Sequence, residues 1–461
     1  MEGSSPQVSE PLCIISGCRI LAPGHDPAQQ NDIHLSKDGK ILSITPHIPK
    51  PTASNVLDAT NYLLAPSLCH AHIHLDKCFL LSDPKFADLE IVRGDFAEAM
   101  KLTSKAKARF THEDLIRRGK WLVAESIAAG VTHMRAFVEV DLVVEFKCLD
   151  AAIELKHFFA QACEIQICAF AQDPIFSAPH GEENRRLMEQ AVRRQDVEVV
   201  GSTPYVEDDE ENTRLNIEWA TQTALNLNKH LDLHLDYNLD STKTPLTHTV
   251  IRHLNTINWP CHTNDTPQKT ISLGHCTRLT LLPHPDLLAL RESIQVLPLT
   301  LIGLPTSDIY IQGRPPLPPN TTTNPNTATQ HRPRGTLQIP HLIRTYNIPA
   351  CISINNVGNA FTPHGNCDPL SIASMGIGIY HAGTKDDAGL LYECVSSRAK
   401  VAIGFPEGQV GGGEANFALF GRGDGEGGLL SRARGRRTLQ EVVCDPPRER
   451  KTVFRGRLVG V

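Results

Sequence analysis

Short apolar runs separated by turn residues mark both ends of the chain. Apolar residues within 33–35 precede the dipeptide Asp38-Gly39, and a second apolar run occupies residues 41–44. Asp-Gly between short apolar runs is typical of a β-hairpin. The pattern therefore predicts short strands within residues 12–62 and another strand at residues 451–459. We expect both chain ends to form one small β-domain, a β-sandwich, around a central insert.

Strand and helix patterns alternate through the centre of the chain. Thr111 is placed to cap a helix that runs to Ala129, Gly130 ends the helix, and residues 131–140 predict the next strand. Most of the later strand patterns are separated by helical stretches, and they occupy residues 165–170, 231–235, 271–275, 296–302 and 350–354. Repeated βα units favour a parallel barrel or a doubly wound sheet, and periodicity alone does not decide between them.

Two stretches carry little periodic signal. Residues 314–335 are rich in Pro, Thr and Asn and predict a long exposed loop. Residues 409–437 are rich in Gly and Arg and are interrupted by one apolar run at 417–420. We expect irregular structure in both stretches.

The composition is that of an ordinary globular protein. Of the 461 residues, 41% are hydrophobic and 21% are charged. The net charge of −6 gives no reason to expect nucleic acid or an anionic membrane as a partner. No apolar run approaches the ~20 residues of a membrane span. Residues 1–5 lack the basic and apolar regions of a signal peptide.

The thirteen cysteines are scattered, odd in number and without a Cys-x-x-Cys pair. Several lie inside apolar stretches, such as Cys163, Cys168 and Cys351. Buried free thiols in a reducing compartment fit this pattern better than a disulfide framework. The expected location is therefore cytoplasmic.

Three histidines, His70, His72 and His74, occupy alternate positions in one short segment. In a strand, alternate side chains point to one face, so the three imidazoles would project together. Neighbouring imidazoles suit a borderline divalent ion such as zinc or iron. A polar strand end with hydrogen-bonded histidines is the alternative. The apolar run at 63–66 leads directly into the cluster and so places it at a strand exit, which favours the metal.

Further candidate ligands lie at the exits of later strands, as a barrel site requires. His234 and His275 each end such a strand. Either one alone is more often a core or surface histidine, but two of them downstream of a His-x-His strand indicate a shared site. Gln172 also follows a strand and could hold a planar amide-like substrate by paired hydrogen bonds, although alone it is ordinary loop polarity.

Other metal and nucleophile templates do not match. The zinc site of one class of nucleobase deaminases needs His-x-Glu and Pro-Cys-x-x-Cys. The sequence contains His180-Gly-Glu182, but Pro260-Cys261 has no second cysteine three positions later. No His-Glu-x-x-His helix, phosphate-binding loop or Gly-x-Ser-x-Gly elbow is present.

The chain resembles a known family. Residues 64–77, Leu-Ala-Pro-Ser-Leu-Cys-His-Ala-His-Ile-His-Leu-Asp-Lys, are similar to the signature of the amidohydrolase superfamily, specifically its cytosine deaminase and isopropylammelide amidohydrolase branch. Segments that resemble this branch follow in the expected order at 111–140, 166–177, 231–236, 305–314 and 351–370. The resemblance implies an α/β fold: a (β/α)₈ TIM-like barrel over residues 66–404, with a β-sandwich built from residues 1–65 and 405–461.

The resemblance also implies a function. It points to a metal-dependent hydrolase that acts on a non-peptide carbon–nitrogen bond of a small cyclic amide or amine and holds one divalent ion, zinc or iron. His275 would orient and polarise the water at the metal, Gln172 would bind the amide edge of the substrate, and Asp308 falls where the family has a substrate-facing loop residue. A homo-oligomer is a further expectation. The implied metal ligands are His72, His74 and His234.

Two catalytic positions depart from the family pattern. Asn355 stands where the family has an aspartate that ligates the metal and accepts a proton, and an amide cannot act as a general base near neutral pH. Tyr237 stands where the family's deaminases have a proton-shuttling glutamate, and a phenol with a reference pKa of about 10 is a poor base. Phe137 replaces a histidine common in the branch. The groups that could take over acid–base roles are Asp308, Asp236, Asp76, Asp368 and Lys77.

Three hypotheses follow. The favoured one is the metal-dependent hydrolase, because random decay would not be expected to spare all of the site histidines. The second, which rests on Asn355 and Tyr237, is a barrel that has lost hydrolysis and binds a small molecule or a partner protein. The third is a proton-transfer enzyme, such as an isomerase, with Tyr237 and Lys77 as acid and base.

Overall fold

The computed structural model describes residues 6–460, except 23, 50–52, 261–268, 313–334, 409 and 423–433. Almost all of the loop expected at residues 314–335 therefore lies outside the described residues, and so does part of the stretch 409–437. The apolar run inside that second stretch forms a strand. Among the described residues, no helix is long and apolar enough to cross a membrane.

Eight parallel strands of the described chain form the central sheet and follow one another in sequence order. They are β6 (Leu68–His74), β7 (Val131–Glu139), β8 (Glu164–Ala171), β9 (Val197–Ser202), β10 (His230–Leu235), β11 (Ile271–His275), β12 (Leu299–Gly303) and β13 (Ala350–Ile352). The two ends of the sheet meet at a bridge between Ile73 and Asn355. There His74 N donates to Asn355 O (2.8 Å) and Asn355 N donates to His72 O (3.1 Å). This closure decides for the barrel over the doubly wound sheet.

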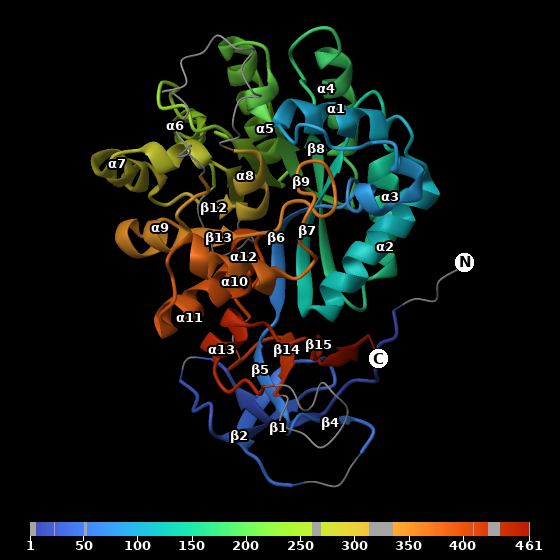
Figure 1. Ribbon diagram of the computed structural model, residues 1–461, viewed down its shortest axis with the longest axis vertical. Coiled ribbons are helices and arrows are strands. Elements are labelled where there is room, and N and C mark those ends of the chain that lie inside the picture. The colour runs from blue at the N-terminus through green and yellow to red at the C-terminus, as the bar shows by residue number, and fades with distance from the viewer. Residues whose placement is uncertain are drawn as a thin grey trace.

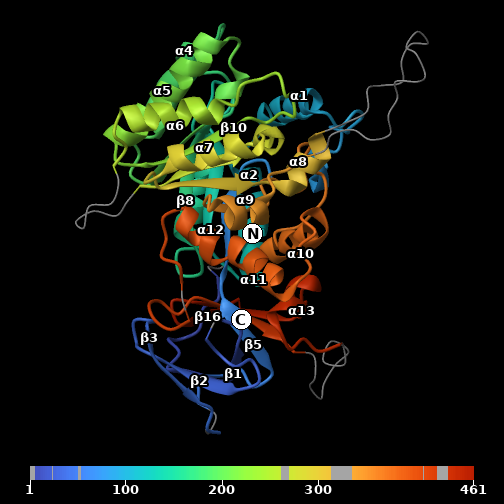
Figure 2. The same cartoon turned by 90° about the vertical axis from the view of Figure 1, so that its left-hand side faces the viewer.

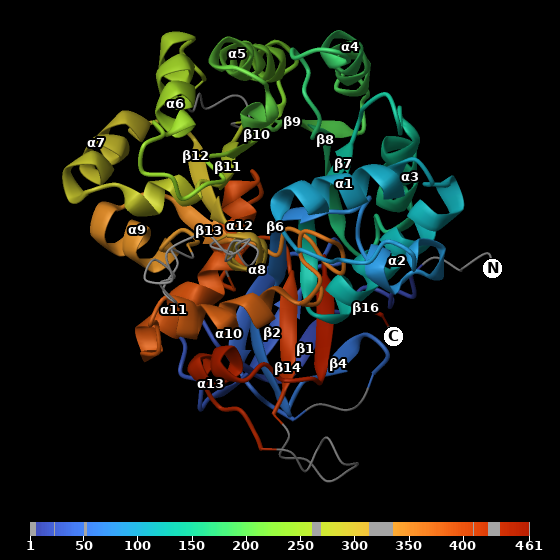
Figure 3. The same ribbon diagram turned by 45° about the horizontal axis from the view of Figure 1, so that its top comes forward.

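Most of the helices surround the barrel on its outer side (Figures 1 and 3). Their bounds are α1 (Phe96–Lys107), α2 (His112–Ala128), α3 (Lys147–Phe158), α4 (Gly181–Ala191), α5 (Glu210–Asn226), α6 (Leu246–Thr256), α7 (His284–Ile294), α8 (Pro305–Ile311), α9 (Ile339–Tyr346), α10 (Pro369–Ile379), α11 (Lys385–Cys394), α12 (Ser397–Ala402) and α13 (Leu439–Cys444). Helix α12 instead packs against the lower end of the barrel interior. Apolar side chains of the strands and of the inner helix faces form one large core. Arranging the helices outside the sheet leaves the strand ends to build the site.

Several local predictions can be compared with these elements. Thr111 caps α2, and Asp114 completes a reciprocal capping box with it. The strand expected at 296–302 begins only at Leu299. The predictions omitted β9 altogether, because its charged Glu198 interrupts a short apolar run that directly follows an arginine-rich segment.

Both chain ends build a second, mixed sheet, which confirms the predicted small β-domain. Its strands are β1 (Ile14–Ile20), β2 (Gln30–Leu35), β3 (Ile41–Pro46), β4 (Val56–Asp58), β5 (Tyr62–Pro66), β14 (Phe417–Gly421), β15 (Arg450–Phe454) and β16 (Arg457–Val459). The predicted hairpin joins β2 to β3 in antiparallel register, with Ile33 opposite Ile44. C-terminal β14 pairs with N-terminal β5. The domain limits 1–65, 66–404 and 405–461 stay a prediction.

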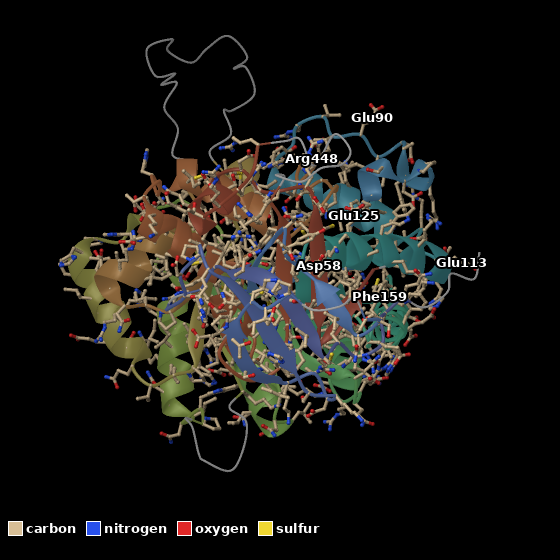
Figure 4. All side chains as sticks on the ribbon, turned by 90° about the horizontal axis from the view of Figure 1, so that it is seen from below. Asp58, Glu90, Glu113, Glu125, Phe159 and Arg448 are labelled. Carbon is tan, nitrogen blue, oxygen red and sulfur yellow. The ribbon has the colours of Figure 1, made fainter. Side chains whose placement is uncertain are left out.

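The small sheet lies across the lower end of the barrel, far from the strand ends that carry the histidines (Figures 1 and 2). Seen from below, its strands lie in front of the barrel (Figure 4). Arg450 on β15 ties the two parts together, because its guanidinium donates to Ala129 O (2.8 Å) and to both oxygens of Asp368 (2.8 and 2.7 Å). Asp368, one of the candidate acid–base groups, therefore has a structural role at this junction.

A buried lysine lies at the same junction. Lys400 on α12 is 1% exposed, and its Nζ donates to Ser67 Oγ (2.7 Å). Burial disfavours the charged form and lowers the pKa of Lys400 to about 8. The unfolded chain, with a lysine pKa of about 10.4, binds more protons than the folded chain between these two values. The contribution of Lys400 to stability therefore rises as the pH rises from about 8 to about 10.

Replacing this lysine tests that linkage. Lys400→Met is expected to raise the free energy of unfolding at pH 7 by about 1–3 kcal/mol, because the buried ammonium is removed. Denaturant unfolding of wild type and variant from pH 7 to 10 should show their difference shrinking as the pH rises. The exposed control Lys37→Met should change nothing. A constant difference over this range would contradict the linkage.

Candidate active site

Twelve described side chains line a narrow cavity at the carboxyl ends of the barrel strands. Catalytic groups of (β/α)₈ barrels lie at this end, because loops from several strands converge there. Histidine, amide, ammonium and aromatic groups share the cavity wall. The lining residues are His74, Lys77, Phe96, Gln172, Tyr205, His234, Tyr237, His275, Ser307, Asn355, Asn356 and Phe361.

Three buried imidazoles meet at the base of this cavity. His72 and His74 come from β6, and His234 comes from β10. One potential ligand atom from each lies within 4.8 Å of the others, and His72 Nε2 is 2.9 Å from His234 Nε2. Burial lowers the pKa of all three imidazoles well below the usual value, which leaves them neutral with lone pairs available.

His70 does not join this cluster, contrary to the expectation from strand alternation. Its Nε2 lies 3.1 Å from Ser126 Oγ on helix α2. The pairing of β6 with β7 shifts register between His70 and Ile73. Such an irregularity breaks the period-2 alternation, so only His72 and His74 face the barrel axis.

Phe137 on β7 packs directly against the cluster. Its ring stacks on that of His72, with centroids 4.0 Å apart and planes 28° apart. The opposite side of Phe137 meets Phe170 on β8 at 5.4 Å. Phe137, which replaces a histidine common in the branch, therefore restrains the His72 ring by packing against it. Its phenyl ring offers no metal ligand.

Asn355 lies beside the histidines, just beyond β13. Its backbone closes the barrel against β6 and has φ of +69°, in the left-handed region that asparagine tolerates best after glycine. Its side-chain Nδ2 donates to Ser307 Oγ (2.7 Å). Its Oδ1 is buried and has no hydrogen-bond partner. An acceptor oxygen thus stands unsatisfied next to three neutral imidazoles.

These residues fit a divalent metal ion. Two imidazole nitrogens that bind one zinc ion at the tetrahedral angle lie about 3.3 Å apart, close to the 2.9 Å between His72 Nε2 and His234 Nε2. Three imidazoles and one oxygen form a donor set that suits zinc and also iron. The buried Oδ1 of Asn355 would complete such a set with a neutral oxygen.

His275 ends β11 and faces the cavity with its orientation fixed from behind. Its Nδ1 lies 2.7 Å from Asp308 Oδ1, and Thr336 Oγ1 donates to Asp308 Oδ2 at 2.7 Å. Burial raises the pKa of Asp308 above its ordinary value, although the hydrogen bonds to His275 and Thr336 oppose this. Both carboxylate oxygens are engaged, and Asp308 is not among the residues that line the cavity. Its expected substrate-facing role stays a prediction.

Tyr237 lies on the loop after β10, beside His275, with ring centroids 4.1 Å apart. Its hydroxyl donates to Ser307 O at 3.4 Å. Its ring meets Phe96 of α1 at 5.7 Å, and Phe96 in turn meets Phe361 at 5.9 Å. Tyr237, which replaces the family's glutamate, is therefore one of three aromatic residues that cap the cavity, together with Phe96 and Phe361.

A chain of buried charges reaches the cavity from the side of β7. Lys77 Nζ donates to Glu139 Oε1 (2.7 Å) and to Gln172 Oε1 (3.3 Å), and Lys107 Nζ donates to Glu139 Oε2 (2.7 Å). Burial acts to raise the pKa of Glu139, but the two ammonium groups outweigh it and lower that pKa to about 2. The sequence analysis missed Glu139 and Lys107. Glu139 could have been predicted as a site residue, because it is the last residue of a barrel strand.

The other candidate acid–base groups lie elsewhere. Asp236 accepts hydrogen bonds from the backbone of Leu246 (2.7 Å) and Thr247 (3.0 Å) at the start of α6. Asp76 Oδ2 accepts from the backbone N of Glu139 at 2.7 Å. Of the five groups considered, only Lys77 is among the residues that line the cavity.

Comparisons with known proteins agree with this arrangement. No family model matches the chain. N-isopropylammelide isopropyl amidohydrolase of Pseudomonas sp. is 26% identical over 253 residues, which are 54% of this chain and 56% of that protein. The match thus spans little more than half of the relative's length. Among solved structures, 5-methylcytosine deaminase of Klebsiella pneumoniae matches with a TM-score of 0.76 at 21% identity over 96% of both chains.

The chain shares the (β/α)₈-barrel fold of this deaminase. An adenosine deaminase of Xanthomonas campestris with bound zinc shares the same fold, with a TM-score of 0.65 at 13% identity over 98% of this chain and 93% of that one. The predicted resemblance and fold class are confirmed by these matches.

Proposed function

We propose that the protein is a metal-dependent hydrolase of a carbon–nitrogen bond in a small cyclic amide or amine. One observation carries the proposal: the buried triad of His72, His74 and His234 opens into a cavity lined by amide, ammonium and aromatic side chains. The names of the similar proteins, an ammelide amidohydrolase and two deaminases, support the same bond type. The cytoplasm is the proposed location, because buried free thiols suit a reducing compartment.

The three histidines would hold the ion, and Asn355 Oδ1 would offer a neutral oxygen beside them. A divalent ion held by imidazoles acts as a Lewis acid and makes water a competent nucleophile near neutral pH. His275, held by Asp308 at 2.7 Å, presents its other ring nitrogen toward the same cavity. We assign it the task of orienting the attacking water.

Hydrogen-bond donors dominate the polar wall on the Lys77 side. Gln172 Oε1 already accepts from Lys77, so the amide NH₂ of Gln172 and the ammonium of Lys77 are both donors. Two adjacent donors favour a substrate edge with acceptors, such as ring carbonyl oxygens or unprotonated ring nitrogens. The cap formed by Phe96, Tyr237 and Phe361 suits the flat face of a ring.

Lys77 is the proposed proton donor to the leaving nitrogen. Asn355 carries no ionisable group, and the Tyr237 hydroxyl donates to a backbone carbonyl. Lys77 lines the cavity, is buried and donates a hydrogen bond to Glu139, which fixes the position of its Nζ. The names of the similar proteins, an amidohydrolase and two deaminases, favour hydrolysis over the alternatives of a binding protein or a proton-transfer enzyme.

Replacement of Lys77 tests this role. Lys77→Met is expected to lower kcat by about 10²–10⁴-fold while zinc content stays unchanged, because a general acid is lost and the triad is not touched. Turnover and metal content measured on the same preparation give both values. The exposed lysine variant Lys105→Met is the control. A Lys77→Met enzyme with normal kcat would assign the proton transfer to another group.

A substrate panel tests the function itself. Zinc-loaded protein should release ammonia or isopropylamine from at least one of cytosine, 5-methylcytosine and N-isopropylammelide, and a chelator should stop the release. Amine release is followed by a coupled assay or by mass spectrometry. Folded, zinc-loaded protein that turns over none of these and no related pyrimidine or triazine would count against a hydrolase.

A further inference from the structure

A buried ion pair lies one layer below the histidine triad inside the barrel. Arg135 on β7 and Asp232 on β10 are completely buried, and Arg135 Nη1 donates to Asp232 Oδ2 at 2.8 Å. Arg135 also donates to Gln166 Oε1 and to Ser272 Oγ, both at 2.9 Å. These bonds come from four different strands, so the position of the Asp232 carboxylate is fixed by the barrel itself.

The strand period explains why the pair lies where it does. Asp232 precedes His234 by two residues on β10, and Arg135 precedes Phe137 by two on β7. Side chains two residues apart point to the same face of a strand. Inward side chains of a barrel stack in layers, so the ion pair lies directly beneath the layer that holds His234 and Phe137.

The second carboxylate oxygen of Asp232 faces the triad. Oδ1 has no hydrogen-bond partner and lies 4.0 Å from His72 Nδ1, which also has none. The other ring nitrogen, His72 Nε2, points the opposite way, 2.9 Å from His234 Nε2. The two nitrogens of His72 therefore have separate environments: one faces a carboxylate and the other faces the candidate metal site.

We propose that Asp232 is a positioning residue that selects the tautomer of His72. The carboxylate favours a proton on Nδ1, which leaves the Nε2 lone pair free toward the triad. Arg135 acts through Asp232 by holding its other oxygen. At 4.0 Å the contact is electrostatic and longer than a hydrogen bond of about 2.9 Å. This inference rests on the proposed metal site for its purpose, but the tautomer of His72 is a property of the protein alone.

Carboxylates behind metal-binding histidines have a measurable effect in general. They fix the ring and its tautomer, and their loss typically lowers metal affinity by about 10–100-fold. Phe137 stacks on one face of His72 and restrains its tilt, but a phenyl ring has no preference between the two nitrogens. Asp232, by contrast, distinguishes the two nitrogens, because its Oδ1 faces Nδ1.

The test compares wild type with Asp232→Asn in two measurements. The first is the ¹⁵N spectrum of metal-free, ¹⁵N-histidine-labelled protein, with the His72 signal assigned by its loss in His72→Ala. Wild type should show His72 protonated at Nδ1, and Asp232→Asn should shift it toward the Nε2-protonated form. The second is a zinc titration against a competing chelator, in which Asp232→Asn should bind about 10–100-fold more weakly.

Two further variants keep the test decisive. Gln166→Leu removes one bond to Arg135 without touching Asp232, and it should leave both readouts unchanged. If Asp232→Asn does not fold, Asp232→Asn combined with Arg135→Gln removes both charges together and takes its place. Normal zinc affinity and an unchanged His72 signal in the Asp232 variant would overturn the inference. Failure of wild type to bind zinc would instead overturn the metal site, and the ¹⁵N signal would still decide the role of Asp232.

Discussion

His234→Ala is expected to lose zinc binding and turnover together. Two remaining imidazoles and a neutral amide cannot hold zinc as three imidazoles do, so the dialysed variant should retain less than about a tenth of an equivalent. A Lewis-acid metal contributes several kcal/mol to transition-state stabilisation, and each 1.36 kcal/mol is a factor of ten. Turnover should therefore fall by at least about 10³-fold, as measured beside metal content on one preparation.

A histidine on the same strand provides the matched control. His230 lies at the opposite end of β10, where its Nδ1 is 2.9 Å from Thr270 Oγ1 and far from the cavity. His230→Ala also removes a buried imidazole, so its effect should appear in stability and not in zinc content. Full zinc occupancy in His234→Ala would mean that the zinc is bound elsewhere. The triad would then be a hydrogen-bonded histidine cluster and no metal site.

Asn355→Asp is expected to raise both zinc affinity and hydrolysis. Asn355 Oδ1 lies buried and unpartnered beside the triad, and Ser307 Oγ can reverse its role and donate to a carboxylate. A carboxylate there would bind the ion more tightly than an amide and would also act as a general base. The expected gain in kcat is about 10²–10⁴-fold, the usual contribution of one such group.

A matched variant of the neighbouring residue, Asn356→Asp, shows whether the gain comes from the position of the carboxylate or only from its negative charge. Asn356 also lines the cavity, but its Oδ1 already accepts a hydrogen bond from Asn359 Nδ2 at 2.8 Å. Asn356→Asp should therefore leave zinc affinity close to that of wild type. Equal gains from both variants, or a loss of zinc in Asn355→Asp, would contradict the placement of Asn355 at the ligand position.

Strand alternation and spacing predicted repeated βα units and histidines at strand exits, and the family resemblance predicted the barrel and the ligand set. The pattern His-x-His at a strand exit, with later histidines at other strand exits, predicted side chains that the barrel does bring together. It failed at His70, because an irregular register between β6 and β7 reverses the face and leaves no trace in the residue pattern.

Tertiary convergence explains what the sequence could not reveal. Lys77, Lys107 and Glu139 meet within hydrogen-bond distance although long stretches of chain separate them. The contact between Asp308 of the short helix α8 and His275 at the end of β11 is another such pairing. No local pattern encodes such contacts, because they depend on how neighbouring strands and loops are staggered around the barrel.

The most direct test of the account is the metal content of the purified wild-type protein, measured by elemental analysis and followed by chelator treatment. The account predicts close to one zinc or iron per chain, bound at the triad of His72, His74 and His234, and loss of hydrolysis when the metal is removed. A protein that is metal-free, folded, active and insensitive to chelators would contradict it.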